Sequence, residues 1–199
     1  MIVIMKEKAH RRETEKKYKH ALKADPNDVA TRLEYGNFLS EMGRLKGAEE
    51  QYKLAVNADP NFAAAHNNYG VLLESRGHKE EAEKQYKLAL EANPKYAVAH
   101  YNYGNILKKM ERIEEAEKQY RLAIENDPNL AAAHHNYGLL LHNMNRKEEA
   151  EIQYKLAIEA DPKDIDIHWN YGILLEELGR KEEAAMQYLL ALRAVSDKV

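Results

Sequence analysis

Histidine, tyrosine and the acidic residues are the side chains of this protein that are able to bind a metal or act as acid, base or nucleophile. The 199 residues include nine His, 13 Tyr and no Cys. Without cysteine there are no disulfides and no thiolate metal ligands, a composition that fits a reducing compartment. A metal site would therefore depend on the spacing of histidines and carboxylates.

Four histidines recur at an interval of 34 residues: His66, His100, His134 and His168. If each stands on its own pair of helices, neighbouring imidazoles are separated by about a helix diameter, roughly 10 Å. That separation is too large for two rings to share one zinc ion through bonds of about 2 Å. His134 and His135 are adjacent, so their rings point to different faces of a helix. We interpret the column as packing and expect no metal site.

Ten tyrosines follow the same interval in two columns, which are Tyr35, Tyr69, Tyr103, Tyr137 and Tyr171, and Tyr52, Tyr86, Tyr120, Tyr154 and Tyr188. We interpret both columns as core. The sequence has no Gly-rich phosphate loop, catalytic-triad spacing or paired-carboxylate site, and Glu-Glu pairs such as Glu114-Glu115 are expected helix starts. We therefore expect a protein without catalytic residues or cofactors, which is not an enzyme.

Glycine, proline and alanine keep the same period. A Gly follows each tyrosine of the first column, and the five prolines are Pro26, Pro60, Pro94, Pro128 and Pro162. Two alanine columns begin at Ala48 and Ala55 and recur in every later repeat. A fixed period of this length indicates an array of repeated structural units.

Residues 63–96 show what one unit predicts. Between Ala63 and Arg76, apolar residues recur at helical spacing, which predicts a first helix. Gly77 supplies a C-terminal stop, and a second helix follows before Pro94. The unit is thus a helical hairpin with a three-residue turn. Gly70 lies inside the first helix, where glycine costs about 0.5–1 kcal/mol relative to alanine. We expect close helix packing beside the ring of Tyr86 to offset that cost.

The second helices also carry acidic and basic residues four positions apart, as in Glu49 and Lys53, Glu83 and Lys87, Glu117 and Arg121, and Glu151 and Lys155. Pairs of this spacing and order stabilise a helix by a few tenths of a kcal/mol. We interpret them as a solvated outer surface.

The pattern resembles the tetratricopeptide repeat family, whose 34-residue helix–turn–helix unit has a W-x2-L-G-x2-Y, Ala, aromatic, Pro signature. Here Tyr69-Gly70, Ala82, Tyr86 and Pro94 match it. His or Arg32 replaces the Trp, and the Leu and Tyr exchange places. The resemblance implies an all-α, right-handed superhelical solenoid of antiparallel helix pairs. We expect one solenoid over residues 1–199, with a half repeat at 1–28 and full repeats at 29–62, 63–96, 97–130, 131–164 and 165–198.

In that family the exposed side of the first helices lines a concave groove where ligands lie. We call this surface the groove face; it comprises residues 64, 67, 68, 71, 74 and 75 of the second repeat and their equivalents. The repeats agree in the core but differ here, which favours recognition of a protein or peptide. The candidate binding residues are Asn67, Asn68, Tyr101, Asn102, Asn105, Lys108, Lys109, His135, Asn136, Trp169 and Asn170.

One column of the groove face is uniform: Asn68, Asn102, Asn136 and Asn170. This ladder resembles the peptide-binding asparagines in the superhelix of O-linked N-acetylglucosamine transferase. The alternative is that each Asn bonds to the neighbouring helix. A clamp for chaperone tails is disfavoured, because Leu33, Asn67 and Val98 stand where that clamp needs cations.

Charge and the ends of the chain bear on partners and location. A net charge of −3, with 32% charged residues, gives no field suited to nucleic acid or an anionic membrane. The apolar start, residues 1–5, is too short for a signal-peptide core or a membrane span. We therefore expect a cytoplasmic protein with no nucleic-acid or membrane partner.

The last repeat lacks the charged outer columns and has Ala185, Met186, Leu189 and Leu190 instead. Arrays usually end in a polar cap, so this face predicts self-association, and residues 1–5 offer a second apolar end. Two other functions therefore stay open beside peptide binding. One is a structural protein that stacks on its own copies, and the other is the targeting arm of a separate enzyme.

Overall fold

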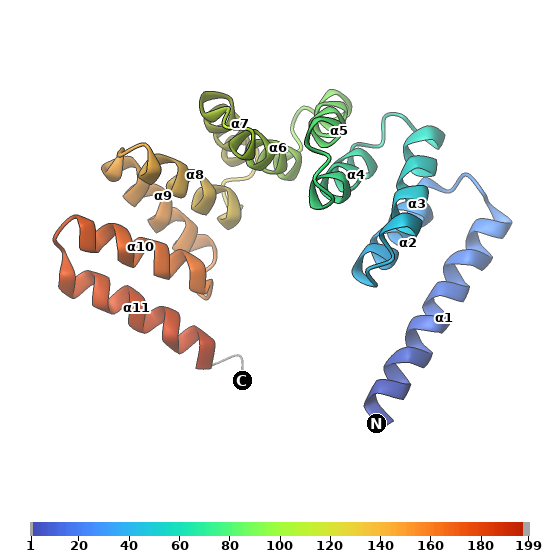
Figure 1. Cartoon of the computed structure of the whole chain (residues 1–199), viewed down its shortest axis with the longest axis horizontal. Coiled ribbons are helices and arrows are strands. Elements are labelled where there is room, and N and C mark those ends of the chain that lie inside the picture. The colour runs from blue at the N-terminus through green and yellow to red at the C-terminus, as the bar shows by residue number, and fades with distance from the viewer. Residues whose placement is uncertain (1, 197–199) are drawn as a thin grey trace. The chain divides into compact units, whose positions relative to one another are not determined.

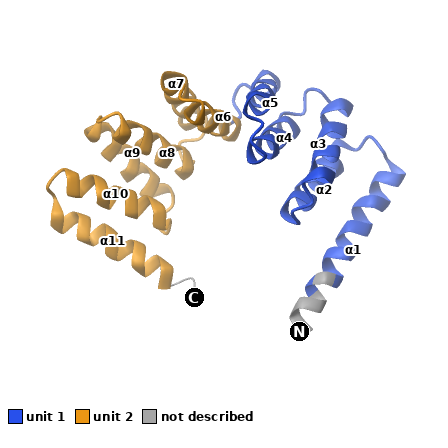
Figure 2. Ribbon diagram, viewed as in Figure 1, with its two compact units in different colours: residues 1–96 blue, residues 97–199 orange. Residues whose placement is uncertain are grey.

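The computed structural model describes residues 2–196, apart from the side chains at positions 2–6 and 8. These residues form two compact units, 1–96 and 97–199 (Figure 2). In the first unit the helices are α1 (Ile2–Ala24), α2 (Val29–Glu41), α3 (Leu45–Ala58), α4 (Ala63–Ser75) and α5 (Lys79–Ala92). In the second they are α6 (Ala97–Lys109), α7 (Ile113–Asn126), α8 (Ala131–Asn143), α9 (Lys147–Ala160), α10 (Ile165–Glu177) and α11 (Lys181–Ser196).

Within each unit, successive helices form antiparallel pairs: α2 with α3, α4 with α5, α6 with α7, α8 with α9 and α10 with α11 (Figure 1). Each pair is one predicted repeat, and the turn between α4 and α5 has the expected three residues, 76–78. The predicted all-α solenoid of helix pairs is confirmed. Helix α1 precedes the pairs and packs on α2, where Tyr18 stacks on Tyr35 at a ring distance of 5.4 Å.

The glycine inside each first helix makes room for an aromatic ring. A Cβ atom on Gly70 would lie 2.7 Å from Cε1 of Tyr86, and one on Gly172 would lie 2.4 Å from Cε1 of Tyr188. Real Cβ atoms essentially never show contacts below 3.0 Å. The predicted close approach is confirmed, and the approaching group is the ring of the second-helix tyrosine.

The histidine column joins each pair of helices to the turn that precedes it. In His66 the Nδ1 atom contacts the side-chain amide of Gln85 at 2.7 Å, and Nε2 contacts the carbonyl oxygen of Pro60 at 3.0 Å. The carbonyl oxygen of Pro60 only accepts, so Nε2 donates to it. The rings of His134 and His168 make the same two contacts. All four histidines of the column are buried, which agrees with a packing role.

Arg32 fills the same position in the first repeat. Its Nε donates to the carbonyl oxygen of Pro26 at 2.8 Å, and its Nη1 donates to Gln51 at 3.0 Å. The glutamine partners were missed by the sequence analysis, although they also recur every 34 residues, at Gln51, Gln85, Gln119, Gln153 and Gln187.

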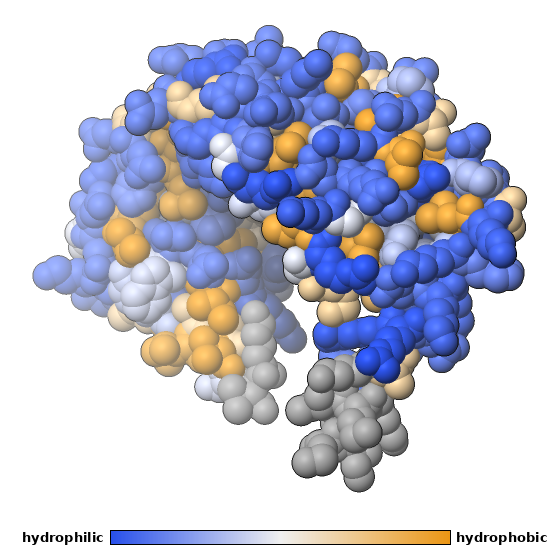
Figure 3. Space-filling model, turned by 45° about the vertical axis from the view of Figure 1, so that its right-hand side comes forward, coloured by the Kyte–Doolittle hydropathy of each residue, from blue (hydrophilic) through white to orange (hydrophobic). Residues whose placement is uncertain are grey.

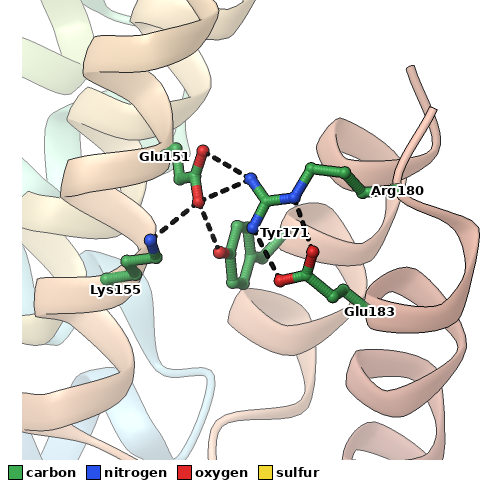
Figure 4. A network of polar contacts seen from close by, with 5 residues as sticks. All are labelled: Glu151, Lys155, Tyr171, Arg180 and Glu183. Carbon is green, nitrogen blue, oxygen red and sulfur yellow. Dashed lines mark hydrogen bonds and ion pairs between the residues drawn. The ribbon is translucent and has the colours of Figure 1, made fainter. Parts of the chain in front are cut away.

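The interpretation of the second-helix glutamates as a solvated outer surface is wrong. Glu151 is only 16% exposed, and it joins the fourth repeat to the fifth (Figure 4). Its carboxylate accepts from Arg180 at 2.8 Å and from the hydroxyl of Tyr171 at 3.0 Å, in addition to Lys155 at 2.7 Å. Nε and Nη2 of Arg180 in turn donate to Glu183.

The same junction recurs along the chain. Glu117 accepts from Arg146 at 2.8 Å and from the hydroxyl of Tyr137 at 2.9 Å, and Glu15 accepts from Arg44 at 2.8 Å. In the folded chain these glutamates therefore tie one repeat to the next. Sequence spacing within one helix did not show this, because the partners lie 20 and 29 residues away.

Candidate functional site

The second unit carries nine of the eleven predicted groove residues. Helix α6 presents Tyr101, Asn102, Asn105, Lys108 and Lys109, helix α8 presents His135 and Asn136, and helix α10 presents Trp169 and Asn170. Asn67 and Asn68 lie on α4 of the first unit. Asn67 is 3% exposed and donates to Oδ1 of Asn68 at 3.0 Å.

The amide nitrogens of the asparagine ladder reach back to the preceding first helix. Nδ2 of Asn136 donates to Oδ1 of Asn105 at 2.8 Å and to the hydroxyl of Tyr101 at 3.2 Å. Nδ2 of Asn68 makes the equivalent bond to Asn37 at 2.8 Å. Asn170 differs, because its Nδ2 lies 3.0 Å from Nε2 of His135. Asn68, Asn136 and Asn170 thus bond to neighbouring helices through their nitrogens.

Two carboxamide oxygens of the ladder, unlike the nitrogens, have no bonding partner in the described part of the protein. Over residues 2–196, no protein donor is found for Oδ1 of Asn136 or Asn170, and both residues are half-buried. A carboxamide oxygen has two acceptor sites. These oxygens are therefore available to the N–H groups of a bound chain while the nitrogens hold the ladder in place.

Aromatic side chains on the groove face rest on the core tyrosines. Tyr101 lies against Tyr120 with ring centroids 6.4 Å apart, and His135 lies against Tyr154 at 6.1 Å. Trp169 lies against Tyr188 at 5.0 Å and is still 49% exposed. A large side chain held on one side and open on the other is a suitable anchor for a partner.

Lys108 places a cation on this surface. Its ammonium is half-buried, and burial together with the neighbouring charge of Lys109 lowers its pKa. Burial is also the main cause of the lowered pKa of His135. The positive charge of Lys108 lowers this pKa further. His135 is therefore neutral near pH 7, and Lys108 supplies the positive charge beside it.

The acidic residues near the C-terminal ends of α4 and α10 have partners of their own. Glu74 accepts from the hydroxyl of Tyr86 at 2.8 Å, and Glu176 accepts from Tyr188 at 3.0 Å. Glu177 lies 3.0 Å from Nε2 of His142 and 2.8 Å from Nζ of Lys147. These tyrosine hydroxyls reach the groove face from the second helices, and the sequence analysis missed them.

The groove face of the first unit contains a pocket of about 270 Å³ between α2 and α4. Asn37, Tyr52, Asn68 and Val71 contribute to its lining. The hydroxyl of Tyr52 donates to Oδ1 of Asn37 at 2.7 Å, and that oxygen also accepts from Asn68. Polar groups at the floor and an exposed Val71 at the rim suit an extended chain better than an ion. Nowhere in residues 2–196 do three or more His, Asp or Glu side chains come together in a way that could hold a metal.

The outer face of α11 exposes large apolar side chains. Met186, Leu189 and Leu192 are 55%, 59% and 60% exposed, and apolar side chains gather next to the C-terminal end of the described chain (Figure 3). The predicted Ala185 and Leu190 are also exposed. Leu192 and Val195 extend the patch and were missed. Residues 1–5 were predicted as a second apolar end for self-association. Their side chains lie outside the described part of the structure.

Comparison with known proteins gives one family. Models described as tetratricopeptide repeat match residues 11–72, 63–96, 86–118, 131–164 and 157–198, and a model described as TPR repeat matches residues 104–145. Together they span residues 11–198. A search of curated protein sequences finds no match. Among the described residues, no helix is both long enough and apolar enough to cross a membrane.

Solved structures share the fold at low sequence identity. MamA is 24% identical, over 82% of this chain and 95% of its own, with a TM-score of 0.71. YrrB, described as a TPR protein with an unusual peptide-binding site, is 24% identical over 90% and 93%, with a TM-score of 0.67. PilF of Pseudomonas aeruginosa is 21% identical over 83% and 76%, with a TM-score of 0.79.

Proposed function

The chain belongs to the tetratricopeptide repeat family, and from that premise we propose that it is a non-enzymatic scaffold that binds an extended segment of a partner protein on its groove face. One observation carries the proposal. The carboxamide oxygens of Asn136 and Asn170 have no protein donor among the described residues, and Trp169, next to Asn170 in the chain, is half-exposed. YrrB, a protein of similar fold, has a peptide-binding site.

The spacing of the repeats suits an extended chain. Such a chain rises about 3.3 Å per residue, so a repeat offset of roughly 10 Å, about one helix diameter, corresponds to three residues. Asn136 and Asn170 would then bond the partner's backbone at every third residue, independently of its sequence. In this proposal residues 1–199 act as one continuous solenoid.

Selectivity would come from the side chains around the ladder. Trp169 and Tyr101 offer surfaces for apolar side chains, and Lys108 offers a charge to an acidic residue. We therefore infer that the preferred partner segment has apolar side chains and a central acidic residue.

Two substitutions in the ladder test the proposal. A partner is first isolated with the wild-type protein from lysate and identified by mass spectrometry, and its bound segment is synthesised. The Asn136→Ala, Asn170→Ala protein should bind that peptide about 1–3 kcal/mol more weakly, since each hydrogen bond contributes about 0.5–1.5 kcal/mol. Its helical content, measured by circular dichroism, should be unchanged. Wild-type affinity in this variant would show that the ladder is only structural.

A second candidate function is self-assembly through α11, and the exposed Met186, Leu189 and Leu192 favour it. Exposed apolar patches commonly mark interaction sites. The partner that we propose for this surface is a second copy of this chain, whose own α11 presents the same apolar face. This contact lies outside the groove face, so the two functions are compatible.

A further inference from the structure

The hydroxyl of Tyr154 has no hydrogen-bond partner. It is the only fully buried side-chain oxygen or nitrogen without one over residues 2–196, and the Tyr154 side chain is 0% exposed. Leaving a buried hydroxyl unbonded is unfavourable, because the group loses its hydrogen bonds to water without replacement. The position therefore requires a physical explanation.

The other repeats show how this hydroxyl is normally satisfied. Tyr52 donates to Oδ1 of Asn37 and Tyr120 donates to Oδ1 of Asn105, at 2.7 and 2.8 Å. In the second and fifth repeats the acceptor is instead a glutamate one turn later, Glu74 or Glu176. Four of the five equivalent tyrosines are thus bonded by one of two positions on the groove face.

The fourth repeat has a different residue at both of these acceptor positions. Leu139 stands where the first and third repeats have Asn, and His142 stands where the second and fifth have Glu. The Nε2 atom of His142 is already engaged by Glu177 at 3.0 Å. Tyr154 consequently has no acceptor, and Asn170, which has no asparagine to donate to, contacts His135 instead.

The first and third repeats also define what would fit here. In each of them a single carboxamide oxygen accepts from two donors, the tyrosine hydroxyl and the ladder asparagine of the next repeat. The corresponding donors in the fourth repeat are Tyr154 and Asn170. We propose that a bound partner segment supplies the missing amide carbonyl oxygen at this position, accepting from the Tyr154 hydroxyl and from Nδ2 of Asn170.

This inference rests on the proposed function and specifies the chemistry of one subsite. The oxygen is that of a neutral amide, either a side-chain carboxamide or a main-chain carbonyl, because the carboxamides of Asn37 and Asn105 fill the equivalent position in the first and third repeats. Leu139 is half-exposed and makes no polar bond. Because Leu139 stands at the position of Asn37 and Asn105, whose side chains contact the equivalent hydroxyl, we expect a change of its rotamer to open the way to Tyr154.

Selection from a random-peptide display library tests the subsite directly, with the wild-type protein and a Leu139→Asn variant as matched baits. The variant restores the arrangement of the first and third repeats and fills the subsite from within. We expect the wild type to enrich Asn or Gln at one peptide position and the variant to lose that preference. If the main-chain carbonyl is used, the two consensus sequences agree, but the variant binds about three- to tenfold more weakly.

Other outcomes overturn the inference. Equal consensus and equal affinity would mean that only a bound water satisfies Tyr154. A wild-type preference for Asp or Glu that the Leu139→Asn variant loses would contradict a neutral amide. If neither protein enriches any peptide, the proposed function itself fails, and the inference with it. The two failures are therefore distinguishable.

A second pair of variants keeps the test independent of Leu139. Tyr154→Phe removes the unbonded hydroxyl, so the unliganded protein should be at least as stable as wild type, while affinity for the selected peptide falls about three- to tenfold. Tyr137→Phe is the control, because its hydroxyl is bonded to Glu117 at the junction between repeats and not to a residue of the groove face. It should lose thermal stability and keep its peptide affinity. The reverse pattern would contradict the inference.

Discussion

At the scale of single residues, the five Tyr-Gly pairs show how composition and packing are linked. A glycine in a helix is unfavourable by itself, and it is retained because a tyrosine ring occupies the space of its missing side chain. The sequence predicted the close approach from the period of the glycines. It did not identify the tyrosine hydroxyls as donors to the groove face, because their acceptors lie 12 or 15 residues earlier on another helix.

Gly70→Ala tests the ring contact. Helix propensity alone favours alanine by about 0.5–1 kcal/mol, whereas forcing a methyl group into a filled space typically costs about 1–3 kcal/mol. The Cβ atom would lie 2.7 Å from Tyr86, so we expect net destabilisation, measured as a lower midpoint of urea unfolding. Combining it with Tyr86→Leu should give less than the sum of the two single effects. A neutral or stabilised Gly70→Ala protein would contradict the packing argument.

At the scale of elements, the junction between repeats depends on the half-buried glutamates and the arginines that follow them. Burial alone would raise the pKa of Glu151, but hydrogen bonds from Lys155, Arg180 and Tyr171 outweigh it and lower the pKa to about 2. The pKa of Glu15 is also lowered to about 2, first by Lys19 and then by Arg44. A lowered pKa means that the folded state prefers the charged carboxylate.

The pH dependence of stability follows from this shift. Above an ordinary glutamate pKa of 4.5 the stabilisation by Glu151 is fully present, and it is lost as the pH falls towards about 2, where the folded protein also takes up the proton. We expect the midpoint of thermal unfolding to fall through this window, and to fall less in Glu151→Gln. Glu159→Gln, an exposed change of equal charge on the same helix, is the control. Identical pH profiles for Glu151→Gln and wild type would contradict the assignment.

How far the sequence predicts these elements depends on the range of the interaction. The 34-residue period, Gly77 and the prolines determine where helices start and stop, so the helix pairs were predictable from local signals. Glu117 and Glu151 also have partners in the next repeat, whereas helical spacing within one segment identified only the neighbour four residues on, such as Lys155 for Glu151. In the groove, the residue types indicated binding, but only the fold shows that the ladder's nitrogens are already engaged.

At the scale of the whole molecule, the fifth repeat is chemically different from the four repeats before it. The glutamate column of the earlier second helices ends in Ala185, and the basic column ends in Leu189. Helix α11 therefore lacks the groups that join one repeat to the next and exposes apolar side chains in their place.

Self-association through this face predicts concentration-dependent dimers in sedimentation velocity. Met186→Glu with Leu189→Glu should weaken them, since it places carboxylates in an apolar contact. Ile152→Glu is the control, because Ile152 on α9 is as exposed as Met186 but lies outside the patch. A protein that stays strictly monomeric at high concentration would exclude this second function.

The central claim is that the groove face binds an extended partner segment. The most direct measurement is the affinity, by titration calorimetry, of the synthesised partner peptide for the wild type and for Trp169→Ala. Loss of a central aromatic anchor typically costs about 2 kcal/mol or more, so we expect at least that loss with unchanged helical content. Ile152→Ala, an equally exposed apolar residue outside the groove face, should bind like wild type. Unchanged affinity in Trp169→Ala together with loss in Ile152→Ala would place the binding surface elsewhere and contradict the account.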